Sequence, residues 1–210
     1  MSEEVDLVTD LGCIIEPWTC GYLETNKECT YKTNREKYSE ERDSILLDNQ
    51  TGVSASKLIL GRYSEWAAAL MNQPKGEMYL LNEQFIVKPP RSSRQSQFVW
   101  HRDSDYYEQM NLQEEPTIAC WTALDAVDQT NGTVVIGSLS DKNTTKVVTA
   151  PAGSVLFMSS KLFHHSTGNS SDKFRRAYMP QYSIRPLVYP NKGGIPLSQQ
   201  CVGLAVKCLE

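Results

Sequence analysis

Residues 163–177 read FHHSTGNSSDKFRRA: a short first run, a polar stretch rich in turn residues, and a second run that contains two arginines. This pattern predicts strand, turn and strand, because Gly, Asn, Ser and Asp favour turns between extended segments. A hairpin of this length folds Arg175 back beside His164, where a guanidinium can bind a carboxylate in bidentate fashion. The segment therefore places a histidine and a candidate anion anchor on neighbouring strands.

Outward from this hairpin, the chain from Glu77 onward consists of short β-rich runs separated by turn residues. Seven such runs at this spacing indicate a sandwich or barrel, because turn residues recur between short segments of strand-forming composition. The predicted strands span 77–88, 97–101, 117–124, 133–136, 145–149, 154–158 and 174–184.

The first 75 residues are helical in character rather than β-rich. Residues 34–48 are dense in Glu, Lys and Arg, which predicts a mostly exposed helix. Residues 54–71 carry apolar side chains at spacings near three and four, which predicts an amphipathic helix that ends at Asn72-Gln73-Pro74. The predicted apolar stripe comprises Leu58, Ile59, Tyr63, Trp66, Ala67 and Leu70.

Length and composition set the class of protein. At 210 residues with 40% apolar and 22% charged residues, the chain is expected to form one soluble globular domain. A net charge of −4 disfavours nucleic-acid or membrane-surface binding. No apolar run approaches the roughly 18 residues of a membrane span, and the acidic start is unlike a signal peptide. We therefore expect a cytoplasmic protein without a membrane partner, and its six cysteines, which form no C-x-x-C pair, are expected to be reduced.

A candidate metal site lies in Trp100-His101-Arg102-Asp103. On an extended segment the side chains of His101 and Asp103 point to the same face, so both can bind one ion. His164 follows 63 residues later and can supply a third ligand. Two histidines and one carboxylate on one face of a metal leave positions open for other ligands, as in non-haem Fe(II) oxygenases.

Several ordered pieces of the chain, between about Tyr79 and Tyr182, resemble the phytanoyl-CoA dioxygenase family of Fe(II)/2-oxoglutarate-dependent oxygenases. The pieces are VKPP at 87–90, WHRD at 100–103, ACWTAL at 119–124, TNG at 130–132, GS at 137–138 and the segment 164–175. The resemblance implies a mainly β fold with helices: a double-stranded β-helix, or jelly roll, over 77–184. A helical layer over about 1–75 and an irregular tail over 185–210 would complete a single oxygenase domain over 1–210.

The resemblance also implies roles for seven residues. His101, Asp103 and His164 would ligate iron, Arg175 would bind the distal carboxylate of 2-oxoglutarate with help from Ser166, Trp121 would lie against this co-substrate, and Asn82 would contribute a polar contact. The chain departs from the family at two points: His165 stands where a glycine is usual, and the Pro-Gly-Ser-His turn is reduced to Gly137-Ser138. Neither departure removes a ligand.

Each assignment has a structural alternative. On a strand, the side chain of His165 points away from that of His164, so we expect that His165 does not ligate the metal. Trp121 can be a core residue, and Ser166 can form only local hydrogen bonds. Arg176 is expected to be solvated or structural, so the anchor role falls to Arg175. The pair Tyr106-Tyr107 fits packing and substrate contact equally well.

The reaction that the resemblance implies consumes O2 and 2-oxoglutarate, releases succinate and CO2, and hydroxylates a small-molecule metabolite. Related enzymes that halogenate lack the carboxylate ligand, and Asp103 therefore favours hydroxylation. Desaturation, epoxidation, cyclisation and a non-catalytic jelly-roll protein that binds a metal or ligand remain alternatives. The sequence identifies neither the substrate nor the oligomeric state.

The segment over 88–97 joins two predicted strands just before His101. Its small polar residues suit a mobile loop over the metal, and its positive charges at Lys88, Arg91 and Arg94 would attract an anionic group of the substrate. The alternative is a solvated linker.

Overall fold

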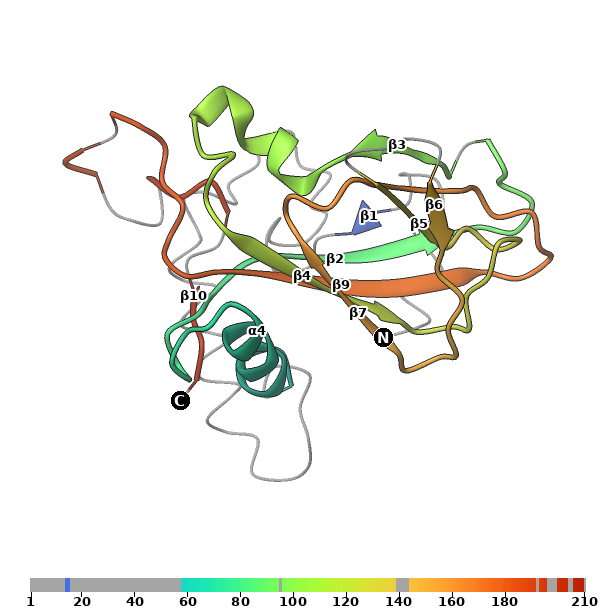
Figure 1. Cartoon of the computed structure of the whole chain (residues 1–210), viewed down its shortest axis with the longest axis horizontal. Helices are drawn as coiled ribbons and strands as arrows, with labels where there is room; N and C mark the ends of the chain where they lie inside the picture. The colour runs from blue at the N-terminus through green and yellow to red at the C-terminus, as the bar shows by residue number, and fades with distance from the viewer. Residues whose placement is uncertain are drawn as a thin grey trace. The chain divides into compact units, whose positions relative to one another are not determined.

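The structure, a computed structural model, describes residues 14–15, 58–94, 96–138, 144–191, 193–195, 200–203 and 206–209. Over these residues the chain is built mainly of β-strands, with few helices (Figure 1). The helix predicted over 34–48 lies outside them. Within the same ranges, no helix has the length and apolar character needed to cross a membrane.

The described strands form two sheets. The larger sheet has the order β1-β2-β9-β4-β7, with β10 also paired to β2, and the smaller has the order β3-β8-β5-β6. All seven predicted strands are present, and each of their ends lies within two residues of the prediction. The strands are Ile14–Ile15 (β1), Tyr79–Lys88 (β2), Phe98–His101 (β3), Thr117–Ala123 (β4), Val134–Gly137 (β5), Thr145–Val147 (β6), Val155–Ser159 (β7), His164–Ser166 (β8), Arg175–Ser183 (β9) and Val206–Lys207 (β10).

Contacts divide the chain into two compact units. The first, which we call the sheet unit, contains the described residues within 14–15, 84–109 and 119–179. The second, which we call the helix unit, contains those within 58–83, 110–118 and 180–209. The strands β2, β4 and β9 contribute residues to both units.

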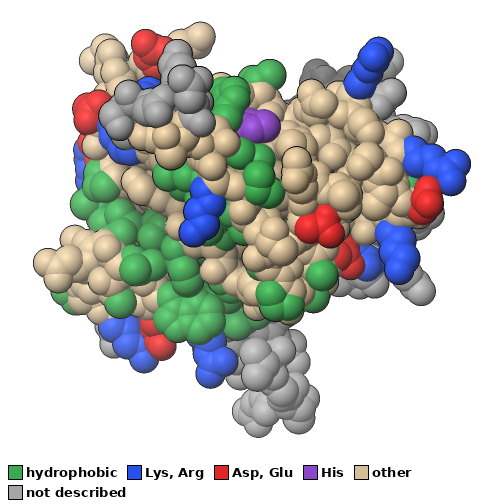
Figure 2. All heavy atoms as spheres, turned by 45° about the vertical axis from the view of Figure 1, so that its right-hand side comes forward, with side chains coloured by type: hydrophobic (Ala, Val, Ile, Leu, Met, Phe, Trp, Pro, Cys, Tyr) green, Lys and Arg blue, Asp and Glu red, His purple; other side chains and the backbone are tan. Residues whose placement is uncertain are grey.

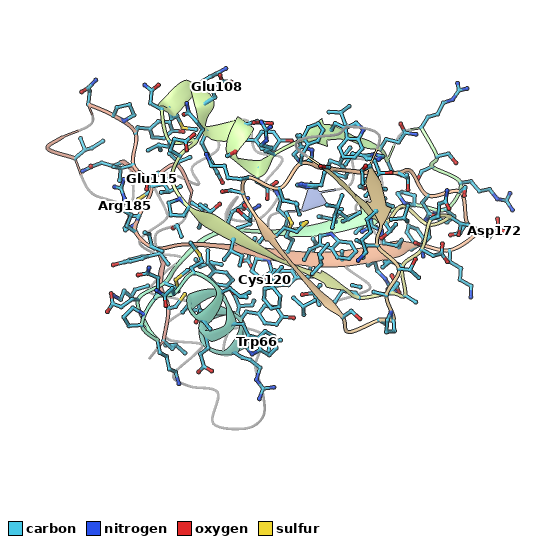
Figure 3. All side chains as sticks on the ribbon, in the orientation of Figure 1. Trp66, Glu108, Glu115, Cys120, Asp172 and Arg185 are labelled. Atoms are coloured by element: carbon cyan, nitrogen blue, oxygen red, sulfur yellow. The ribbon has the colours of Figure 1, made fainter. Side chains whose placement is uncertain are left out.

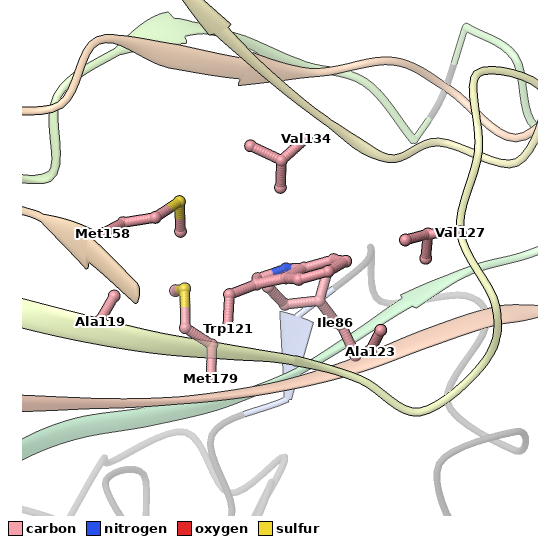
Figure 4. Close-up of a cluster of buried hydrophobic side chains, with 9 residues drawn as sticks. Ile86, Ala119, Trp121, Ala123, Val127, Val134, Met158 and Met179 are labelled. Atoms are coloured by element: carbon pink, nitrogen blue, oxygen red, sulfur yellow. The ribbon is translucent and has the colours of Figure 1, made fainter. Parts of the chain in front are cut away.

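The core of the sheet unit is formed by side chains from both sheets (Figure 4). Trp121 of β4 and Met179 of β9 come from the larger sheet, and Val134 of β5 comes from the smaller one. Phe98 of β3 and Ile136 of β5 pack against this cluster. The two sheets of this unit therefore pack face to face, and the residues of β3, β5 and β8 that share the face of Phe98 and Ile136 point inward.

The helix unit begins with the π-helical segment η2 (Leu58–Tyr63), which continues as α4 (Ser64–Leu70). The predicted stripe is correct at Ile59, Tyr63 and Ala67, which are buried, and wrong at Trp66 and Leu70, which are 39% and 59% exposed. The π-helical turn explains the difference, because its wider hydrogen-bond spacing shifts the helical phase of the residues that follow. The helix ends where predicted, with Asn72 in the left-handed region at φ 55°.

The predicted irregular tail is attached to the helix unit at several points. The strand β10 pairs with Tyr79 and Leu80 of β2. Arg185 forms an ion pair with Glu115, and its Nε donates to Glu115 Oε2 at 3.1 Å (Figure 3). The tail therefore contains one short strand that its Pro- and Gly-rich composition did not predict.

Candidate metal centre

The three predicted metal ligands lie together in the sheet unit. His101 ends β3, His164 begins β8, and these two residues are directly paired across antiparallel strands. Asp103 begins the 3-10 helix η3 (Asp103–Met110), and its Oδ1 lies 3.7 Å from His101 Nε2 and 3.8 Å from His164 Nε2. One ligand atom from each residue lies within 4.8 Å of the others. In the part of the chain that the structure describes, no other such group of three is found.

The route to this convergence differs from the predicted one. Asp103 does not continue the strand of His101, because the chain leaves β3 and turns into η3 directly after Arg102. The helical turn, rather than the alternation of an extended segment, brings the carboxylate beside both imidazoles. Asp103 is buried, with 6% of its surface exposed.

Backbone carbonyls orient both imidazoles. His101 Nδ1 lies 2.7 Å from the carbonyl oxygen of Val99, and His164 Nδ1 lies 3.0 Å from that of Leu162. A carbonyl oxygen only accepts, so each Nδ1 carries the proton, which leaves the lone pair of each Nε2 for a metal ion. Burial also lowers the pKa of His164, which favours the neutral imidazole that binds metal. Two nitrogen donors and one carboxylate fit Fe(II), because this set occupies one face of the ion.

The predicted anion anchor lies in the same unit, but the predicted hairpin is wrong: the strand of His164 (β8) belongs to the smaller sheet and that of Arg175 (β9) to the larger one. Arg175 is the first residue of β9, it is 1% exposed, and its Nη2 donates to the carbonyl oxygen of Gly132 at 2.8 Å. Its guanidinium carbon lies 5.5 Å from the ring centre of Trp121, so Trp121 contacts this cation as well as the core in Figure 4. Trp121 is therefore a core residue, and its contact with the co-substrate stays a prediction.

A second buried cation, Lys88, was missed by sequence reasoning. Lys88 ends β2 with 0% exposure, and its Nζ donates to Ser166 Oγ and to the carbonyl oxygen of Thr167. The aromatic ring of Phe98 lies 5.1 Å from the same Nζ. A lysine at the end of an apolar strand, directly after Ile86-Val87, was the available signal.

The structure corrects the prediction of a mobile positive loop over 88–97. Lys88 is buried rather than exposed, and its carbonyl oxygen accepts a hydrogen bond from Asn169 Nδ2 at 2.9 Å. Ser96 Oγ accepts from the backbone nitrogen of Asn169 at 3.2 Å and from Ser92 Oγ at 2.7 Å. Hydrogen bonds to the β8–β9 connection therefore hold this segment, and only Arg91 and Arg94 remain as exposed positive charges.

Gly132, in the predicted turn, separates the two buried cations. Its φ of +86° suits glycine, and a Cβ there would lie 2.6 Å from Lys88 Cδ. We expect Gly132→Ala to weaken 2-oxoglutarate binding, because the new methyl group displaces the lysine stem while the carbonyl that orients Arg175 shifts. Anaerobic titration of the co-substrate into metal-loaded protein measures this effect.

Gly153→Ala is the matched control for that variant. Gly153 has the same φ of +86°, and among the described residues other than its two chain neighbours no atom lies within 4 Å of a Cβ built there. Both variants are expected to lose stability of about 1–3 kcal/mol from backbone strain. Only Gly132→Ala is expected to bind 2-oxoglutarate more weakly, and equal affinities in the two variants would contradict the role of the cation pair.

Arg176 is held by a different partner. Its Nε and Nη2 donate to the two carboxylate oxygens of Asp125 at 3.0 and 2.9 Å. Burial raises the pKa of Asp125, but the hydrogen bonds from Arg176 outweigh this effect and lower it. The bidentate pair assigns Arg176 a structural contact, as expected.

The structure separates the two tyrosines after the metal ligands. Tyr107 is 9% exposed and packs inside, whereas Tyr106 is 64% exposed and lies edge-on to His101, with ring centres 5.6 Å apart. Figure 2 shows histidine exposed at the surface among hydrophobic side chains. Packing therefore applies to Tyr107, and Tyr106 is available for contact with a substrate.

Asn82 belongs to the helix unit. Its Nδ2 donates to Gln181 Oε1 at 3.4 Å. Its role toward the co-substrate stays a prediction.

Three solved structures with a similar fold are distant from this chain in sequence. EctD from S. alaskensis, with 2-oxoglutarate and 5-hydroxyectoine, gives a TM-score of 0.57 at 16% identity and covers 100% of this chain and 87% of its own. EvdO2 from Micromonospora carbonacea var. aurantiaca, complexed with 2-oxoglutarate, gives 0.53 at 19% identity over 68% of this chain. This chain spans 63% of the length of EvdO2. The predicted jelly-roll fold is thereby confirmed.

The epimerase SnoN, in complex with Fe3+, alpha ketoglutarate and nogalamycin RO, gives a TM-score of 0.50 at 15% identity and covers 92% of each chain. No curated protein matches the sequence significantly. The family model of phytanoyl-CoA dioxygenase (PhyH) matches residues 25–177, which is more than half of the chain and includes the three candidate ligands and Arg175. The family resemblance of the sequence is thus confirmed: the chain belongs to the phytanoyl-CoA dioxygenase family of Fe(II)/2-oxoglutarate-dependent oxygenases.

Proposed function

We propose that this chain is an Fe(II)/2-oxoglutarate-dependent dioxygenase that hydroxylates a small-molecule metabolite. The observation that carries the proposal is the convergence of His101, Asp103 and His164, with one ligand atom of each within 4.8 Å of the others. In the overall reaction, a substrate C–H bond, O2 and 2-oxoglutarate give the hydroxylated product, succinate and CO2. Bound iron supplies the redox chemistry that activates O2 toward the substrate.

The protein groups bind and orient. His101 and His164 offer their Nε2 atoms as nitrogen donors, because backbone carbonyls engage their Nδ1 atoms. Asp103 supplies the anionic donor. A carboxylate here fills a position that a halide would need in a halogenase, and this supports hydroxylation.

The distal carboxylate of 2-oxoglutarate is assigned to the buried cations of the sheet unit. Arg175 offers a planar donor array for bidentate binding, and Lys88 with Ser166 offers a second positive group and a hydroxyl. Gly132 contacts both cations, because its carbonyl oxygen accepts from Arg175 Nη2 and a Cβ at this position would lie 2.6 Å from Lys88 Cδ. Two positive side chains in one region favour an anionic ligand.

The test is product analysis. Protein loaded with Fe(II) and 2-oxoglutarate without oxygen is exposed to O2 in the presence of candidate metabolites, and succinate and product mass are measured. A substrate that raises succinate release and gains one oxygen atom supports the proposal. A product that has lost two hydrogen atoms would indicate desaturation or ring closure. Succinate release that does not require iron would contradict the proposal.

The proposed substrate carries an anionic group. Arg91 and Arg94 are exposed in the sheet unit, and Arg91 Nε contacts Asp172 Oδ1 at 2.7 Å near the tip of the β8–β9 connection, labelled in Figure 3. Exposed pairs are weak, so this aspartate leaves the arginine available to a ligand.

We expect replacement of both Arg91 and Arg94 by serine to raise the substrate KM and to reduce its dependence on salt, because surface charges steer anions through a screened field. Iron content and 2-oxoglutarate affinity serve as internal controls and are expected to stay unchanged. Unaltered kinetics with the true substrate would mean that the segment over 88–97 is a linker whose arginines do not attract the substrate.

A further inference from the structure

The strand that carries His101 contains a β-bulge beside this ligand. Phe98 pairs with Ser166 and His101 pairs with His164, so two residues of β3, Val99 and Trp100, lie opposite the single residue His165 of β8. Such an extra residue reverses the alternation of side chains beyond it. The bulge therefore determines which face of the sheet His101 occupies.

The direction of this effect follows from Phe98, which packs against the core. In a regular strand, Trp100 would share that inner face, and His101 would point outward. With the bulge, Phe98 and His101 both point inward, and Trp100 lies on the outer face. Without the bulge, the imidazole of His101 would point away from Asp103 and His164.

Aromatic contacts lie beside the bulge on the outer face. The ring of Trp100 lies 4.1 Å from that of His165 and 4.8 Å from that of Phe163, centre to centre, and is nearly parallel to the latter. Beneath it, a Cβ at Gly137 would come within 2.8 Å of Trp100 Cζ3. The indole therefore packs against His165 of β8 and against Gly137 of β5, where a side chain would collide with it.

We propose that the Trp100–His165 contact positions the metal ligand His101 by stabilising the β-bulge. This inference rests on the proposed iron site. It assigns a function to His165, the residue at which the sequence departs from the usual glycine. His165 acts here from the face opposite to the ligands, through the strand register, and contacts no substrate or metal.

The test measures binding of Fe(II) alone, under anaerobic conditions, by equilibrium dialysis. His165→Gly and Trp100→Leu are each expected to weaken binding about 10- to 100-fold, as loss of outer contacts to ligands typically does. His165→Phe keeps an aromatic ring against Trp100 and is expected to bind Fe(II) as the wild type does. Val147→Ala, which changes a 37% exposed side chain on β6 of the same sheet, is the matched control and is expected to have no effect.

Two further measurements separate positioning from general destabilisation. The visible absorption of bound Co(II) reports the ligand set, and it is expected to change in His165→Gly and to return in His165→Phe. Gly137→Ala displaces the indole by a separate route and is expected to weaken binding as well. The inference would be overturned if folded His165→Gly kept the Co(II) spectrum and the Fe(II) affinity of the wild type. It would also be overturned if His165→Phe lost as much Fe(II) affinity as His165→Gly. A wild type that binds no Fe(II) would instead overturn the proposed iron site.

Discussion

Replacement of His164 by alanine is expected to abolish stoichiometric binding of Fe(II). The side chain is buried, its Nε2 lies 3.8 Å from Asp103 Oδ1, and its ring centre lies 4.4 Å from that of His101. Loss of one of three protein donors should exceed the roughly 10- to 100-fold cost typical of outer contacts. Metal analysis after anaerobic loading and gel filtration measures the effect.

The neighbouring histidine provides the comparison for this variant. His165→Ala leaves all three donors in place and is expected to retain iron when the metal is saturating, although with lower affinity. His101→Ala and Asp103→Ala are expected to behave like His164→Ala. Iron retained by His164→Ala and lost by His165→Ala would reverse the assignment of the ligand.

The second large effect is expected at Arg175. Arg175→Gln should weaken 2-oxoglutarate binding at least about tenfold, because a charge-assisted hydrogen bond contributes roughly 1.5–3 kcal/mol. The iron content of this variant should be unchanged, which separates co-substrate binding from metal binding. Anaerobic titration of metal-loaded protein gives the dissociation constant directly.

Arg176→Gln is the matched control for Arg175→Gln, since the two arginines are adjacent in β9. Arg176 is paired with Asp125, and its replacement is expected to lower stability, above all at pH values where the aspartate is ionised, without changing 2-oxoglutarate affinity. Loss of affinity in Arg176→Gln with none in Arg175→Gln would exchange the two roles.

The strands were predictable from sequence because local composition determines them. β4 is buried over its whole length, and its sequence TIACWTA contains no charged residue. The turns at Asn131-Gly132 and Gly168-Asn169 contain residues that favour turns. The candidate metal ligands His101 and Asp103 were also predictable, because they are near in sequence. The predicted hairpin of Arg175 with His164 was wrong, because β8 and β9 pair with strands of different sheets, and the contact between sheets is not visible in the local sequence.

The remaining features depend on contacts that no local pattern reports. The bulge in β3 is defined by the pairing of this strand with β8. The contact beside it, between Trp100 and His165, joins residues far apart in the chain. Lys88 was assigned to an exposed loop because lysine is usually exposed, and its burial depends on acceptors at Ser166 and Thr167.

The most direct test of the account is the fate of 2-oxoglutarate. Wild-type protein with Fe(II), 2-oxoglutarate and O2 is compared with His164→Ala and Arg175→Gln, and succinate and CO2 are measured with and without a metabolite that stimulates turnover. We predict equal amounts of succinate and CO2 from the wild type, dependent on iron and O2, with none from His164→Ala and strongly reduced release from Arg175→Gln at low 2-oxoglutarate. Equal release from wild type and His164→Ala, or no release from a wild type that binds both iron and 2-oxoglutarate, would contradict the account.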